Sequence, residues 1–207
     1  SGFLDYLAIG DTYPAFYPSE NPAMVSVAHR TEDNPGNKKK MRYVIFGLDT
    51  LSLGIGYLIS YLRRDGHEVK LIVESISFPD DNDLMRKVRE FKPDACLFSC
   101  ITVYYQWSLR ISKKIKEEIG CKIIFGGLHV TACPDVVREN EWIDEICIGD
   151  GIAYFGYKFN PDEVFPERQD FYDQLAPHYH VHPYMMTSFG CPYHCTYCMP
   201  AHLKITL

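Results

Sequence analysis

The sequence predicts an α/β fold of the doubly wound type, with five parallel strands, over residues 41–151. Short apolar runs alternate with segments of helical periodicity throughout this range, which is the pattern of successive β-α-β units. The apolar runs are rich in Val, Ile and Phe, as expected for strands covered on both faces of a sheet. Pairs of glycines follow several of the runs, where the chain must turn from strand to helix.

The first half of this region predicts two strand–helix pairs. Residues 43–46 are an apolar run that ends at a glycine, as a buried strand does. Apolar side chains at helical spacing over 55–62 predict a helix, which Gly66 ends. Alternation over 69–73 predicts the second strand. A second helical stripe covers 84–91, after acidic residues that suit a helix N-terminus and before a proline that stops it.

The second half continues the same alternation. Residues 95–98 and 122–125 read as the third and fourth strands. Between them, apolar residues at every fourth position over 107–119 predict a long helix. A short helix is expected at 135–140, and a fifth strand at 146–148.

The rest of the chain is less regular. Residues 1–40 form an irregular lead-in broken by four prolines. Residues 152–184 hold five Tyr, four Phe and four Pro with little periodicity, so we interpret them as a linker or interdomain wrap. Residues 185–207 predict a short strand, near 185–188, followed by a loop that carries three cysteines.

Composition narrows the classes of function. The net charge of −6 disfavours nucleic acid or an anionic membrane as the partner. No stretch approaches the ~18 consecutive apolar residues of a membrane span, and the beginning does not resemble a signal peptide. We therefore expect a cytoplasmic protein whose eight cysteines are reduced thiols or metal ligands. Four of them adjoin predicted strands and read as core residues: Cys96, Cys100, Cys121 and Cys147.

The connections after the strands are the candidate binding loops. In a doubly wound sheet, ligands bind at the carboxyl ends of the strands, where the strand order reverses. Glycines gather there, at Gly54, Gly56, Gly126–Gly127 and Gly149–Gly151, and His129 follows the second group. Each glycine taken alone is better explained as a turn residue of a β–α loop, whereas Gly-Gly-Leu-His and Gly-Asp-Gly taken together leave turn formation and ligand binding equally open.

The three cysteines near the C-terminus are the candidate metal ligands. Cys191, Cys195 and Cys198 follow a C-x3-C-x2-C spacing. Three thiolates this close could hold an iron–sulfur cluster with one iron open to an external ligand. A zinc site completed by His194 or His202, or no metal at all, are the alternatives.

The cysteine loop, from Gly190 to Cys198, resembles the cluster loop of radical S-adenosylmethionine (SAM) enzymes, including the aromatic Tyr197 before the last cysteine. Residues 42–151 resemble the cobalamin (B12)-binding domain that precedes the radical SAM domain in one subfamily. This resemblance lies in the 53–58 and 65–69 stretches, in Gly-Gly-Leu-His before Thr131, and in Gly-Asp-Gly. The implied fold is flavodoxin-like. Residues 165–168 resemble the interdomain linker.

The resemblance implies three cofactors. Cys191, Cys195 and Cys198 would hold a [4Fe–4S] cluster, and Tyr197 would contact SAM. Cobalamin would be held without a protein histidine on cobalt, because no D-x-H-x-x-G motif follows the first strand. The candidate cobalamin contacts are Asp49, Thr50, Leu51, Ser52, Leu53, Gly54, Ser99, Thr102, Gln106, Gly126, Gly127, His129, Thr131, Gly149, Asp150 and Gly151.

The implied reaction is reductive cleavage of SAM, most commonly for methyl transfer to an unactivated carbon or phosphorus, with an electron donor such as a flavodoxin or ferredoxin. A radical SAM barrel of about 250 residues cannot follow within the sequence, so this chain alone is expected to be catalytically incomplete. The alternatives are a stand-alone corrinoid-binding module and a zinc-stabilised α/β protein.

Overall fold

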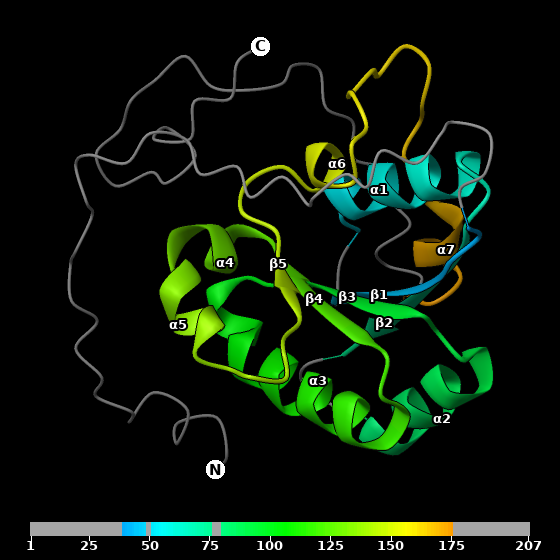
Figure 1. Ribbon diagram of the computed structural model, residues 1–207. Helices are drawn as coiled ribbons and strands as arrows, with labels where there is room; N and C mark the ends of the chain where they lie inside the picture. Colours follow the sequence, from blue (N-terminus) through cyan, green and yellow to red (C-terminus); the bar gives the residue numbers. More distant parts are fainter. Residues whose placement is uncertain (1–38, 49–50, 76–79, 176–207) are drawn as a thin grey trace, which may run out of the picture.

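The computed structural model describes residues 39–48, 51–75 and 80–175. Within them, five strands form one parallel sheet in the order β2-β1-β3-β4-β5 (Figure 1). The strands are β1 (Arg42–Leu48), β2 (Glu68–Glu74), β3 (Ala95–Ser99), β4 (Lys122–Gly126) and β5 (Glu145–Ile146). Ile45 at the centre of β1 pairs with Leu71 of β2 and Leu97 of β3. The chain order reverses direction at β1, since β2 lies on one side of it and β3 on the other.

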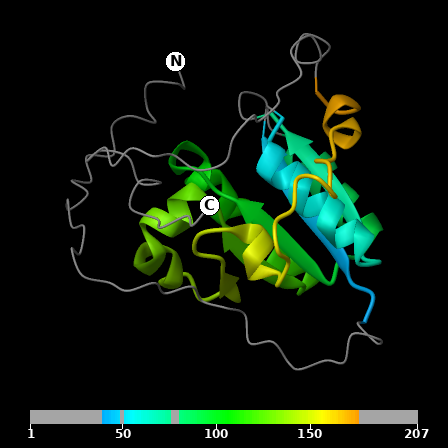
Figure 2. The same cartoon turned by 90° about the horizontal axis from the view of Figure 1, so that it is seen from above.

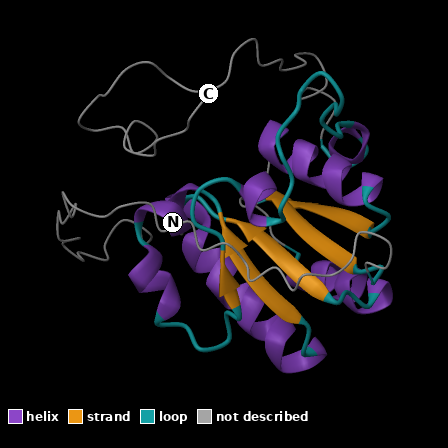
Figure 3. Ribbon diagram, turned by 45° about the horizontal axis from the view of Figure 1, so that its top comes forward, coloured by secondary structure: helices purple, strands orange, loops and turns teal. Residues whose placement is uncertain are grey.

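Helices cover both faces of the sheet (Figure 3). On one face lie α1 (Leu53–Arg64), α6 (Gly151–Tyr154) and α7 (Gln169–Tyr172), and on the other lie α2 (Asp81–Phe91) and α3 (Tyr105–Ile119) (Figure 1). A 3-10 turn, Thr102–Tyr104, leads into α3. Two short helices, α4 (Leu128–Ala132) and α5 (Pro134–Arg138), connect β4 to β5.

The longer helices begin and end where local chemistry requires. The side chain of Ser52 accepts the Ile55 N–H at the start of α1, and Asp80 accepts the N–H groups of Asn82 and Asp83 at the start of α2. Gly120 ends α3 with φ +73°, a conformation that favours glycine.

Each face of the sheet has its own apolar core. On the α2–α3 face, Phe46, Phe98 and Phe125 stack across β1, β3 and β4, with ring centroids 4.4 and 4.9 Å apart. On the α1 face, side chains of the same strands pack against α1 and α7, and Phe171 of α7 is fully buried among them. Successive residues of each strand therefore point into different cores. Because both faces of the strands are buried, their sequences are continuous apolar runs.

The predicted fold class is confirmed for this region. The five strands and the three long helices occur where their patterns indicated, and Cys96, Cys100, Cys121 and Cys147 are buried as predicted. Two details differ. The fifth strand is Glu145–Ile146 rather than 146–148; the Cys147 N–H still donates to the carbonyl of Phe125 in β4 at 2.7 Å, and the chain then turns at Gly149, where φ is +85°. Residues 126–131 were expected as the connection after the fourth strand, and most of them belong to a short helix, α4 (Leu128–Ala132).

Several predictions lie outside the described residues. These are the lead-in at 1–38, the strand near 185–188, the cysteine loop and Tyr197. Among the helices that the structure describes, none is long and apolar enough to cross a bilayer.

Candidate cofactor-binding cleft

A cleft of about 240 Å³ opens at the carboxyl ends of the strands, between the sheet and the helices α1 and α6. It lies at the point where the strand order reverses between β1 and β3, the usual place for a ligand in this architecture. Its volume falls below the about 300–1,000 Å³ typical of pockets that enclose a whole small-molecule ligand. The cleft therefore suits one flat portion of a larger ligand.

The walls of the cleft are mainly apolar. The sheet supplies one wall and the helices α1 and α6 supply the other. The apolar side chains that line it are Ile45, Leu97, Ile124, Ile55, Leu58, Ile152 and Phe155. Asp150, which is exposed, is the one charged residue among the described lining residues. Such walls favour an aromatic or aliphatic group over an anion.

The loop after β4 depends on Gly127. Its backbone has φ +92° and ψ −174°, a region open essentially to glycine alone. A Cβ atom at this position would lie 2.6 Å from the carbonyl oxygen of Cys100 and 2.7 Å from its nitrogen. The close approach allows two backbone bonds between the β3 and β4 loops, Cys100 N–H to Gly126 and His129 N–H to Cys100. Gly127 thus brings two loops of the cleft together.

Thr131 joins the β4 loop to the β5 loop. Its hydroxyl donates to the carbonyl of Gly127 at 2.9 Å and accepts the N–H of Gly149 at 3.0 Å. Gly149 has φ +85°, and the next residue, Asp150, caps α6 by accepting the Ile152 N–H at 2.8 Å. Thr131 does not line the cleft, but it holds the Gly149 turn that does.

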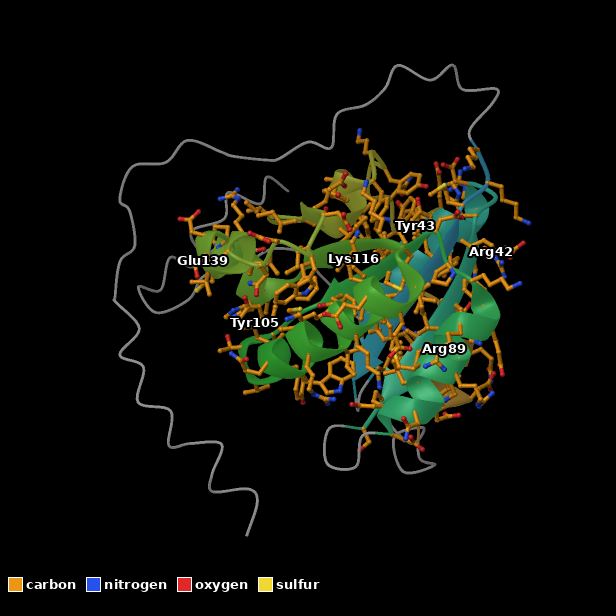
Figure 4. All side chains as sticks on the ribbon, turned by 60° about the horizontal axis from the view of Figure 1, so that its bottom comes forward. Arg42, Tyr43, Arg89, Tyr105, Lys116 and Glu139 are labelled. Atoms are coloured by element: carbon orange, nitrogen blue, oxygen red, sulfur yellow. The ribbon has the colours of Figure 1, made fainter. Side chains whose placement is uncertain are left out.

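His129 is buried beside the cleft rather than in it. Its side chain is 3% exposed, its Nδ1 lies 3.2 Å from Thr102 Oγ1, and its ring lies 4.1 Å from the ring of Tyr105. No described group bonds its Nε2. Burial lowers the pKa of His129, so the ring is neutral near pH 7. Tyr105 bonds the carbonyl of Val136, and it lies at the same end of the molecule as Glu139 (Figure 4).

Cys147 is the one thiol among the described lining residues of the cleft. Burial raises the pKa of Cys147 to about 12. The thiol therefore stays protonated at neutral pH and is neither a nucleophile nor a thiolate ligand there. Cys100, behind the β3–β4 junction, has its pKa raised to about 12 for the same reason.

Exposed apolar side chains stand at the carboxyl edge outside the cleft. Ile101 and Val103 follow β3 and are 40% and 69% exposed, while Leu128 follows β4 and is 52% exposed. We call these three residues the apolar rim. Exposed apolar groups gathered at one edge indicate a surface that another molecule covers.

The structure brings together eight of the sixteen candidate cobalamin contacts named from sequence. Lining the cleft are Ser52, Gly54, Ser99, Gly126, Gly127, Gly149, Asp150 and Gly151. Not lining it are Leu51, Leu53, Thr102, Gln106, His129 and Thr131. Asp49, Thr50, Tyr197 and the cysteines 191, 195 and 198 lie outside the described residues. Among described residues, no group of three His, Cys, Asp or Glu side chains could hold a metal ion.

The apolar walls were missed by sequence reasoning. Ile45, Leu97 and Ile124 are interior strand residues, and nothing in their spacing separates them from side chains of the core. Each lies in the carboxyl-terminal half of its strand or at its centre, and this nearness to the ligand-binding edge of the sheet is the one signal that could have identified them.

Fold and cleft together define a doubly wound α/β domain with an apolar cleft at its switch point. The family described as B12 binding domain matches residues 43–155, and the chain belongs to that family.

Individual relatives match at a distance. The chain is 31% identical over 102 residues to an anaerobic magnesium-protoporphyrin IX monomethyl ester cyclase of Rubrivivax gelatinosus, a match that covers 47% of this chain and 18% of the cyclase. The chain thus spans less than one fifth of that relative.

Two solved structures are also similar. One is the cobalamin-dependent S-adenosylmethionine radical enzyme OxsB with aqua-cobalamin and S-adenosylmethionine bound, at 19% identity and a TM-score of 0.48, covering 55% of this chain and 17% of that one. The other is a cobalamin-binding protein from Desulfitobacterium hafniense DCB-2, at 19% identity and a TM-score of 0.39, covering 56% and 57%.

The described residues fit part of a cobalamin. Cobalamin carries a broad corrin ring and a nucleotide tail that ends in a flat aromatic base. The cleft is too small for the ring, but its apolar walls and narrow volume suit the base. The glycines at its mouth leave the backbone open to close approach.

Proposed function

We propose that this domain binds cobalamin with its nucleotide tail in the cleft and its corrin ring over the carboxyl edge of the sheet. The observation that carries the proposal is an apolar cleft at the switch point of a chain that belongs to the B12-binding domain family. The apolar rim of Ile101, Val103 and Leu128 supports it, since a corrin ring would cover such a surface.

Within the domain, the described residues bind and orient rather than react. Gly127 and Thr131 fix the loops at the mouth of the cleft. The helices α1 and α6 form the wall that faces the sheet. Neither Cys147 nor His129 would be offered to cobalt as a ligand, because the Cys147 thiol stays protonated and His129 is buried beside the cleft. When bound, the cobalamin supplies a cobalt centre that can carry a methyl group.

We further propose that the chain is part of a B12-dependent radical SAM enzyme. The support is the C-x3-C-x2-C loop of Cys191, Cys195 and Cys198, with the aromatic Tyr197. These thiolates would hold a [4Fe–4S] cluster whose open iron binds SAM, and an external flavodoxin or ferredoxin would supply the electron. Methyl transfer to an unactivated carbon or phosphorus is the proposed outcome, on a substrate that the rest of such an enzyme would contact.

The cofactor half is tested by comparing cobalamin with cobinamide, the corrinoid that lacks the nucleotide tail. The whole chain is titrated with each by visible spectroscopy under anaerobic conditions. We expect cobalamin to bind at least about tenfold more tightly, a difference of about 1.4 kcal/mol. Equal affinity for the two would place the tail outside the cleft, and no binding of either would overturn cobalamin as the ligand.

A cleft-filling variant makes this test specific. Ser99 is exposed at the end of β3 and lines the cleft, so Ser99→Phe should fill it and remove the preference for cobalamin over cobinamide. The control is Glu117→Phe, which adds the same bulk to the exposed side of α3, on the opposite face of the sheet. If the control also lost the preference for cobalamin over cobinamide, the added bulk would be acting through the stability of the fold and not by filling the cleft.

The cluster half is tested by metal analysis after anaerobic purification and reconstitution. We expect iron and sulfide near four each per chain, as a [4Fe–4S] cluster requires. Cobalamin uptake without iron would favour a stand-alone corrinoid-binding module. Stoichiometric zinc, with melting on chelation, would favour a zinc-stabilised α/β protein.

A further inference from the structure

The segment after α6 returns to the domain and runs beside α1 (Figure 2). We call residues 164–175 the strap. Viewed from above, it passes from the end of the yellow segment to α7, drawn in orange, along the helix drawn in cyan. The strap lies beyond residue 155, where the match to the B12-binding family ends.

Specific contacts hold the strap on α1. The N–H of Glu167 donates to the carbonyl of Gly56 at 3.0 Å. The guanidinium of Arg63 bonds the carboxylates of Glu167 at 3.1 Å and Asp170 at 2.5 Å. Two turns of one helix are therefore bonded to the strap, by backbone at one end and by charge at the other.

Further contacts hold the strap on the sheet. Phe171 is fully buried and belongs to the same apolar core as Ile55 of α1 and Leu97 of β3. The amide of Gln174 accepts the N–H of Val73 at 3.0 Å and donates to the carbonyl of Leu71 at 3.1 Å. The strap is thus packed into the same core that forms the cleft walls.

The position of the strap explains why residue 56 is a glycine. A glycine inside a helix destabilises it by about 1 kcal/mol relative to alanine, so an ordinary helix position would not use one. At Gly56, a Cβ atom would lie 2.5 Å from the carbonyl oxygen of Glu167 and 3.1 Å from the Cβ of Pro166. The strap occupies the space that a side chain at residue 56 would need.

Helix α1 stands between the strap and the cleft. Ile55 and Leu58 line the cleft, while Gly56 and Arg63 of the same helix contact the strap. A helix held on one side sets the position of the wall on its other side, because packed elements shift as rigid bodies.

We propose that the strap is part of the cobalamin-binding unit and sets the width of the cleft through α1, with Gly56 as the positioning residue. The unit then extends to Leu175 rather than to residue 155. This inference rests on the proposed function, since it concerns the fit of the nucleotide tail that the cleft would hold.

The test uses the whole chain and the variant Gly56→Ala. Alanine favours the helix but cannot coexist with Glu167 at its present distance, so the strap should detach while α1 remains folded. Hydrogen exchange of peptides from 164–175 should become faster in the variant. The control for this readout is Gly54→Ala, on the same helix, where a Cβ atom would meet nothing within 4 Å and the strap should stay protected.

Binding then separates a positioning role from a merely structural one. We expect Gly56→Ala to weaken cobalamin about tenfold, or about 1.4 kcal/mol, and to leave the affinity for cobinamide within about twofold. A detached strap with unchanged affinity for both corrinoids would overturn the inference, as would a strap that stays protected in Gly56→Ala. Failure of the wild-type chain to bind either corrinoid would instead overturn the proposed function, and the inference with it.

Discussion

Replacing Gly127 by alanine is expected to destabilise the domain strongly. Gly127 has φ +92° and ψ −174°, and an alanine held in that region costs about 1–3 kcal/mol. The added Cβ atom would also lie 2.6 Å from the carbonyl oxygen of Cys100, a backbone atom that no rotamer change can move. Such overpacking adds about 1–3 kcal/mol. Together these effects predict a loss of about 4 kcal/mol in the free energy of unfolding.

The assay is urea unfolding followed by circular dichroism, with the whole chain and matched variants. The control is Gly120→Ala at the end of α3, where φ is +73° but a Cβ atom would meet nothing within 4 Å. The left-handed conformation alone should then cost about 1–2 kcal/mol. In thermal melts, each kcal/mol corresponds to about 2–4 °C for a domain of this size.

The difference between the two variants isolates the close approach of the β3 and β4 loops. A loss in Gly127→Ala no larger than that in Gly120→Ala would refute the reasoning, because it would mean that Cys100 can withdraw freely. The slope of the urea transition should stay the same in both, since neither change alters the surface exposed on unfolding.

Three further predictions concern other parts of the chain. Burial lowers the pKa of His129 in the folded chain, so the unfolded chain takes up the proton at a higher pH and the stability of the domain should fall as the pH drops through about 6.5. In His129→Gln, the urea midpoint should depend less on pH in this range. An unchanged pH dependence of the midpoint would contradict the prediction. Phe171→Ala should cost about 3–5 kcal/mol in urea unfolding, as for any fully buried phenylalanine, whereas a loss below about 1 kcal/mol would mean that α7 is not part of the core. Replacing Cys191, Cys195 and Cys198 together by alanine should abolish iron uptake and leave cobalamin affinity unchanged; iron retained in this variant would assign the metal to other ligands.

The fold was predictable because its long elements are periodic. The helices around Ile55 and Ile111 carry apolar stripes that bury one face each, and the strands between them are apolar on both faces. The short elements were not predictable. Helix α4 has five residues, too few to be stable by local propensity, and it forms because Val130 is buried against the sheet.

The site was predictable where glycine marks it. Gly126, Gly127 and Gly149 stand at strand ends, and all three line the cleft. Its apolar walls were not predictable, since a side chain that faces a cleft and one that faces a helix obey the same strand period. The need for glycine at position 56 was not predictable from the sequence either, because it arises from a contact with Glu167, which is distant along the chain.

Strand β2 ends the sheet, since it pairs with β1 alone. An edge strand offers free N–H and C=O groups that can pair with another copy of the same chain. Gln174 meets two of these groups, at Leu71 and Val73, with one side-chain amide, which mimics the pattern of a neighbouring strand. The last residues of the strap therefore cover part of the free edge of β2, and we expect a fragment cut at residue 155 to expose that edge to edge-to-edge association.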